Sequence, residues 1–96
     1  MLILSREAEQ DVRSAFEWYE DQRENLGRAF MAEVDRALEA VQERPEAYLQ
    51  CYKFVRRALC KRFPYAIYFV LKNSDVVVLA VLHQRRHPAS WRKRIQ

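Results

Sequence analysis

The sequence predicts one α+β domain in the order β-α-α-β-β-β, with a helical hairpin packed on a small, mainly antiparallel sheet. Two amphipathic helical stripes occupy the first half of the chain, and three strand-like runs joined by short turns occupy the second half. A length of 96 residues leaves room for a single domain, residues 1–96. The apolar content of 50% and the single glycine indicate a compact chain and exclude a disordered one.

The first helix is predicted from its cap and its apolar spacing. Residues 1–4 are largely apolar and are expected to form a short edge strand. Ser5 suits the N-cap, because its hydroxyl can accept a backbone N–H of the first turn. Apolar residues then recur at helical spacing as far as residue 20 or 21: Ala8, Val12, Ala15, Phe16 and Tyr19.

A second helix follows the polar connection at residues 21–25, which has the short length typical between antiparallel helices. Its stripe consists of Leu26, Phe30, Val34, Leu38 and Val41. Pro45 disfavours helical backbone at the residue before it, so we expect the helix to end near residues 42–43. The prediction is a helical hairpin over residues 5–44 with an acidic outer face.

Residues 46–52 are expected to be a connector tucked against the fold by Tyr48, Leu49 and Tyr52. A strand is predicted over residues 55–60. Alternation along that strand places Val55, Arg57 and Leu59 on one face and Arg56, Ala58 and Cys60 on the other.

Two more strands are predicted over residues 65–71 and 76–82, because both runs are rich in β-branched and aromatic residues. Together with residues 55–60 they form an antiparallel meander over residues 54–83. Pro88 is expected to prevent further regular structure, which leaves residues 84–96 as a basic tail that carries Trp91.

The two halves of the chain have opposite charge. The first 52 residues carry 6 Lys/Arg and 12 Asp/Glu, whereas residues 53–96 carry 11 Lys/Arg and one acid, Asp75. This asymmetry predicts a basic face that binds nucleic acid or an acidic protein segment. Alternatively, the halves neutralise each other where they pack, although this hardly accounts for the cations Arg85, Arg86, Arg92, Lys93 and Arg94.

Composition argues against several other kinds of protein. Cys51 and Cys60 lack partners at metal-ligand spacing and are expected to be structural, so no metal and no cofactor are predicted. No run is long enough to span a membrane, and no signal peptide is recognisable. We therefore expect a cytoplasmic protein.

Four segments, in this order, carry a resemblance to a known family: SREAEQDVRSAFEWYE, RPEAY, VRRALCKRFPYAIYFV and VLAVLHQRRHPASWRKR. They cover nearly the whole chain. Together they resemble the RelE/ParE superfamily of bacterial toxins, and most closely its ParE-like "plasmid stabilisation" branch.

The resemblance implies a toxin that is bound by a cognate antitoxin, of the ribbon-helix-helix type, in a hetero-oligomer. Such antitoxins lay an extended and helical segment over the toxin's hairpin and sheet. The antitoxin contacts expected here are Phe16, Trp18, Tyr19, Phe30 and Tyr68. ParE-like members poison DNA gyrase, whereas RelE-like members cut messenger RNA in the ribosome without metal. A third possibility is a diverged antitoxin-binding protein with little toxicity.

The nuclease alternative makes specific demands on side chains. Metal-free RNA cleavage needs groups that move protons and cations that stabilise the phosphorane. The candidates are His83 for proton transfer, with Arg57, Lys61 and Arg86 as cations, and Tyr65 or Trp91 for base stacking. RelE-like toxins carry a C-terminal tyrosine, or a histidine–tyrosine pair, for this work. In this chain no tyrosine follows Tyr68, and His83 is followed by Gln84.

Gyrase poisoning needs a binding surface but no catalytic residue, and the family branch favours it. The predicted target-binding basic face consists of Arg57, Lys61, Arg62, His83, Arg85, Arg86 and Trp91. Each of these has a simpler alternative. His83 can be a hydrogen-bonded structural residue, Arg57 can be a solvated or salt-bridged arginine, and the cations of residues 92–94 can be a solvated tail.

Overall fold

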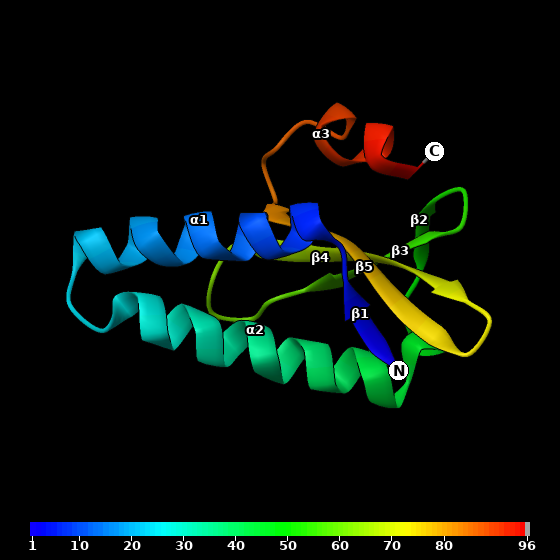
Figure 1. Cartoon of the computed structure of the whole chain (residues 1–96), viewed down its shortest axis with the longest axis horizontal. Helices are drawn as coiled ribbons and strands as arrows, with labels where there is room; N and C mark the ends of the chain where they lie inside the picture. Colours follow the sequence, from blue (N-terminus) through cyan, green and yellow to red (C-terminus); the bar gives the residue numbers. More distant parts are fainter. Residues whose placement is uncertain (96) are drawn as a thin grey trace.

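A two-layer arrangement of hairpin and sheet characterises the computed structural model, which describes residues 1–95 (Figure 1). The helices α1 (Arg6–Gln22) and α2 (Leu26–Glu43) cover one face of a five-stranded sheet. The sheet order is β1-β5-β4-β3-β2, and the strands are β1 (Leu2–Leu4), β2 (Gln50–Tyr52), β3 (Val55–Leu59), β4 (Tyr65–Lys72) and β5 (Asp75–His83). The predicted α+β class and helical hairpin are confirmed.

Polar side chains stabilise the start and the tip of the helical hairpin. The hydroxyl of Ser5 accepts the Ala8 N–H at 3.0 Å, which confirms the predicted cap. At the tip, the carboxylate of Glu20 accepts the N–H groups of Asn25 and Gly27, each at 2.9 Å, and so satisfies the start of α2. A Cβ on Gly27 would lie 2.7 Å from the backbone oxygen of Phe16, so the helices cross closely at the chain's single glycine.

The sheet is mixed, because β1 runs parallel to β5 while β2, β3, β4 and β5 are antiparallel neighbours. The register between β4 and β5 shifts at one point. Tyr68 pairs with Ala80 but Phe69 pairs with Val78, which leaves Leu79 as an extra residue in β5. This bulge changes the alternation of β5. Val78 and Val81 therefore both belong to the core beneath the helices.

A second apolar cluster lies on the outer sheet face, away from the hairpin. It contains Val55, Ala66, Tyr68, Ala80, Leu82 and Trp91. A short helix, α3 (Ala89–Arg92), and the 3-10 turn Lys93–Ile95 contribute Trp91 and Ile95 to this cluster. The Trp91 ring stacks on Tyr68, with centroids 4.4 Å apart, and is 4% exposed.

The prediction of an irregular tail over residues 84–96 is therefore wrong for residues 89–95. Pro88 caps α3 with helical backbone angles instead of ending regular structure, because a proline's fixed φ suits a helix start. Gln96, also part of that prediction, lies outside the described residues.

The connector before β3 is more ordered than predicted. It forms a 3-10 turn, Pro45–Ala47, and the short edge strand β2. Tyr48 and Tyr52 are half-buried as expected, but Leu49 is 85% exposed and is not tucked against the fold. The expected strand of residues 55–60 ends at Leu59.

A partly buried ion pair joins the end of the described chain to α1. Arg94 donates to both carboxylate oxygens of Asp11, at 2.7 and 3.2 Å, and to the Leu79 carbonyl at 3.1 Å. Asp11 in turn accepts the Val81 N–H at 3.0 Å. These two side chains thus bind β5 backbone groups just beyond the end of β1. The Arg94 side chain is 17% exposed. Its charge is therefore neutralised by an acid of the first half of the chain, and Arg94 is not part of a solvated tail.

Candidate functional site

Exposed cations gather at one end of the sheet. Tyr65 pairs with His83, and the Gln84 N–H donates to the Pro64 carbonyl at 2.8 Å, so the β3–β4 turn lies beside the segment after β5. We call Arg62, Arg85 and Arg86 of these two loops, together with His83, the basic end; Lys61, in the first of the two loops, instead donates its backbone N–H to Glu33 of α2. The segments 61–64 and 83–88 contain no acidic residue, so the basic end has a single sign of charge.

The remaining members of the predicted basic face, Arg57, Lys61 and Trp91, lie elsewhere. Arg57 is exposed on the outer face of β3, whereas His83 of the basic end contacts Tyr65 on the helix side of the sheet. Trp91 belongs to α3, and its ring is buried against the outer face of the sheet, so it is not exposed in this conformation. The structure thus separates Arg57 from His83 and removes Trp91 from the surface.

His83 holds a turn. Its Nδ1 accepts the Arg85 N–H at 3.1 Å, and the Nδ1 of His87 accepts the Ala89 N–H at 3.0 Å in the same way. A ring nitrogen that accepts an amide proton cannot itself be protonated, so each imidazole carries its proton on Nε2. In this geometry, the Nε2 of His83 can donate a hydrogen bond but has no lone pair to remove a proton.

Tyr65 supplies a tyrosine next to His83 that the sequence did not reveal. The two ring centroids are 5.6 Å apart in an edge-to-face arrangement. Burial raises the pKa of Tyr65, and the nearby Tyr19 adds to this effect. The hydroxyl therefore stays protonated at neutral pH and is able to donate a hydrogen bond.

Of the five predicted antitoxin contacts, three reach the surface. Phe16 lines a groove of about 380 Å³ on the outside of the hairpin, with Leu4, Glu9, Val12, Arg13 and Met31. Trp18 is 58% exposed, and Tyr19 is half-buried. Phe30 is fully buried and Tyr68 lies under Trp91, so neither is open to a partner in this conformation.

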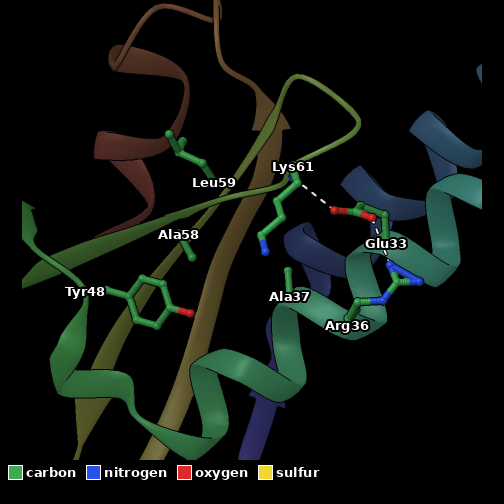
Figure 2. Close-up of a pocket in the computed structure, with 7 residues that line it drawn as sticks. All are labelled: Glu33, Arg36, Ala37, Tyr48, Ala58, Leu59 and Lys61. Atoms are coloured by element: carbon green, nitrogen blue, oxygen red, sulfur yellow. Dashed lines mark hydrogen bonds and ion pairs between the residues drawn. The ribbon is translucent and has the colours of Figure 1, made fainter.

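A small slot lies between α2 and β3, on the helix side of the sheet (Figure 2). Its volume is about 160 Å³, and Glu33, Lys61, Tyr48, Ala37 and Ala58 are among its lining residues. Glu33 accepts the Lys61 N–H at 2.9 Å and an Arg36 N–H at 3.0 Å. The Lys61 amide bond is the main cause that lowers the pKa of Glu33. Figure 2 shows the Lys61 ammonium and the Tyr48 hydroxyl pointing into the slot.

Cys60 lies beside this slot in the core, and burial together with the charge of Glu33 raises its pKa to about 11. Cys51 is exposed. Within residues 1–95, no three His, Cys, Asp or Glu side chains are grouped closely enough to hold a metal ion. No helix in that range has both the length and the apolar character of a membrane span.

A model of the family described as "ParE toxin of type II toxin-antitoxin system, parDE" matches residues 2–88. The chain belongs to this family. The fold of this ParE-family chain is similar to that of a solved structure titled "Chromosomal ParDE TA system from P. aeruginosa". The TM-score is 0.77 and the identity 15%, over 85% of this chain and 92% of that chain. Curated proteins gave no match.

Three contacts of this ParE-family chain join residues that are far apart in sequence: Tyr65–His83, Asp11–Arg94 and Glu33–Lys61. The first follows from strand register, which the turn after β4 sets. The other two join a helix to a strand end or to the C-terminal segment. No local pattern in the sequence signals such contacts.

Proposed function

We propose that this chain is the toxin of a type II toxin–antitoxin pair and arrests growth by binding DNA gyrase through the basic end. The main support for gyrase as the target is the turn after β5, which the His83 side chain stabilises. The Nδ1 atom is occupied by the Arg85 amide, and the neighbouring tyrosine keeps its proton. These two groups therefore suit binding better than proton abstraction.

Antitoxin binding is proposed for the groove on the hairpin. Its lining is largely apolar, with Phe16 and Met31 from facing helices, and Glu9 and Arg13 are its charged lining residues. An amphipathic antitoxin helix could place an apolar residue in this groove and pair its own charges with the rim. Trp18 is largely exposed but lies on another face of α1 from Phe16, so it is a separate candidate contact and not part of this groove.

A matched pair of substitutions at His83 separates the structural role from the catalytic one. Asn can accept a backbone N–H two residues on, as this imidazole does, but cannot transfer a proton near neutral pH. We expect His83→Asn to keep growth arrest and His83→Ala to weaken it. Equal loss of arrest in both variants, with both proteins folded, would contradict a purely structural His83.

The target is tested by the cellular response to expression of the chain. Gyrase binding predicts a DNA-damage response and trapped gyrase–DNA complexes, both reduced by Arg62→Ala and Arg86→Ala. The control is Lys72→Ala, an exposed cation at the opposite end of the sheet, which we expect to behave as the wild type. Arrest without trapped gyrase would refute this target.

The second candidate is ribosome-dependent, metal-independent RNA cleavage, and the Tyr65–His83 contact favours it. This contact restores the histidine–tyrosine pair that the sequence lacks locally. Under this alternative, expression produces cuts at A-site codons, and Tyr65→Phe removes them while the fold is kept. Tight antitoxin binding without any arrest would instead indicate the diverged, non-toxic alternative.

A further inference from the structure

Charge is divided between the two sides of the sheet. Twelve of the thirteen acids precede residue 47, and most of them belong to the helices that cover one face. Residues 47–95 form β2 to β5 and α3, and they contain eleven Lys/Arg and one acid, Asp75. The Asp75 carboxylate lies 3.4 Å from the Met1 ammonium, beside the turn between β4 and β5. The outer sheet face, away from the hairpin, therefore carries cations with almost no neighbouring acid.

Three exposed cations lie where β2, β3 and α3 meet on this face. We call them the outer cations: Lys53, Arg57 and Arg92. The guanidinium carbon of Arg92 lies 4.1 Å from the centre of the Tyr52 ring and 5.5 Å from that of Trp91. The Lys53 ammonium lies 5.4 Å from the centre of the same tyrosine ring. A guanidinium held against aromatic rings keeps its N–H donors free for a further ligand. None of the three cations forms an ion pair within residues 1–95.

Arg57 joins this group from β3. It lies two residues after Val55, a member of the outer apolar cluster, so alternation places both side chains on the outer face. Burial raises the pKa of the Cys51 thiol, and the charges of Arg57 and Arg92 act in the opposite direction. Both guanidinium groups therefore lie near Cys51, which is exposed. The outer cations thus form one patch around Tyr52 and Cys51.

The aromatic rings beside the outer cations are not open to unstacked bases. Arg92 lies over the Tyr52 ring. Trp91 and Tyr68 stack on each other and are 4% and 3% exposed. Single-stranded nucleic acid is bound largely by bases that stack on exposed rings. The patch therefore suits a phosphate backbone whose bases are already paired. Phe54, in the turn after β2, is 77% exposed and provides a test of base stacking.

We propose that the outer cations bind the sugar–phosphate backbone of duplex DNA. Lys53 and Arg57 are four residues apart, so at about 3.3 Å per strand residue they lie about 13 Å apart, which matches about four base pairs of a double helix. The choice of DNA among polyanions rests on the proposed gyrase target, because a toxin bound to gyrase lies beside the DNA that the enzyme holds. The basic end then contacts the enzyme, and the outer cations contact its DNA. Phosphate contacts carry no base information, so this binding is independent of DNA sequence.

Binding is measured by fluorescence anisotropy with the full chain and short labelled DNA duplexes of two unrelated sequences. Three phosphate contacts predict a slope of about −2.7 for the logarithm of the affinity against the logarithm of the salt concentration, or about 40-fold weaker binding at 200 mM than at 50 mM salt. Arg57→Gln and Lys53→Gln should each reduce the magnitude of this slope by about 0.9 and weaken binding about tenfold at 50 mM salt. The matched control Arg28→Gln removes an exposed cation of α2 and should leave both values unchanged.

Cys51 provides a second readout within the patch itself. An uncharged maleimide modifies an exposed thiol at a rate set by access and by the thiolate fraction, so bound duplex should slow the modification of Cys51 by about fivefold or more. Buried Cys60 should stay unmodified with and without DNA. The same concentration of duplex should protect Cys51 less in Lys53→Gln, compared with that variant without DNA.

Thermal unfolding of each variant checks the fold. If Arg57→Gln does not fold, Lys53→Gln and the protection of Cys51 in the wild type decide. Phe54→Ala should bind the duplex as the wild type does, because backbone contacts do not use base stacking.

Several results would overturn the inference. Duplex binding that is absent at 50 mM salt, or that survives Arg57→Gln and Lys53→Gln unchanged, removes its basis. Tighter binding of a single strand, lost in Phe54→Ala, would show base stacking instead. Tighter binding of duplex RNA would refute the choice of DNA, and equal binding of oligoglutamate of matched charge would make an acidic protein the occupant.

This inference and the proposed target fail separately. Trapped gyrase without DNA binding by the chain would overturn the inference and keep the target. DNA binding through the outer cations without trapped gyrase would support the inference and refute the target.

Discussion

Replacing Arg94 with Met should destabilise the fold strongly although the residue lies close to the chain end. The guanidinium makes two bonds to Asp11 and one to the Leu79 carbonyl, and the two side chains are 17% and 10% exposed. Removal of one partner of a fully buried ion pair costs about 3–5 kcal/mol, and this pair is partly buried. Asp11 keeps its bond to the Val81 amide, so we expect the lower end, about 3 kcal/mol. For a chain of this size the melting temperature should fall by about 12–24 °C.

Urea unfolding, followed by circular dichroism, measures this effect. The matched control is Arg85→Met, which removes an exposed cation and should change the free energy of unfolding by less than about 0.5 kcal/mol. Asp11→Asn keeps an acceptor for the Val81 amide, and the double variant with Arg94→Met should show a coupling energy of about 2 kcal/mol. The reasoning fails if Arg94→Met costs no more than Arg85→Met, or if the two effects simply add.

Three further perturbations test other contacts. Gly27→Ala should destabilise by about 1–3 kcal/mol in chemical unfolding despite alanine's better helix propensity, because its Cβ would lie 2.7 Å from a backbone oxygen of the facing helix; unchanged stability would contradict the close crossing. The pKa of Glu33 is lowered mainly by the Lys61 amide, so its stabilisation is complete above the unfolded value of about 4.3 and is lost as the pH falls through the lower folded value. Glu33→Gln should therefore flatten the loss of stability below about pH 4.3 in unfolding measured across pH, and a curve parallel to wild type would rule this out. A thiol reagent at pH 8 should modify exposed Cys51 and spare Cys60, whose pKa is raised to about 11; mass spectrometry that finds both modified in the native protein would contradict the burial.

Local chemistry accounts for the elements that were predicted well. Ser5 and Pro45 bound the hairpin because caps and prolines act within one turn of backbone. Alternation in β3 correctly separated Arg57 from Ala58 for the same reason. The bulge at Leu79 and the burial of Trp91 depend on distant partners, β4 and the outer sheet face, so periodicity alone could not predict them.

The candidate site was predictable in composition but not in arrangement. The sequence predicted which cations lie near the sheet end, and Arg62, Arg85 and Arg86 do lie there. It could not predict that Lys61 turns toward α2, because that depends on Glu33, which is 28 residues away. Nor could it predict that α3 would cover Tyr68, because the helix follows a proline that was expected to end regular structure.

The parallel pairing of β1 with β5 has a consequence for synthesis on the ribosome. Leu2–Leu4 are made well before their partners Val76–Val78, and Asp11 is made well before Arg94. The hairpin emerges early, but the sheet that buries its apolar stripes is completed only by the last strand. Such long-range closure is slow compared with local helix formation. We therefore expect the nascent chain to acquire its folded surfaces only after β5 and Arg94 have left the ribosome.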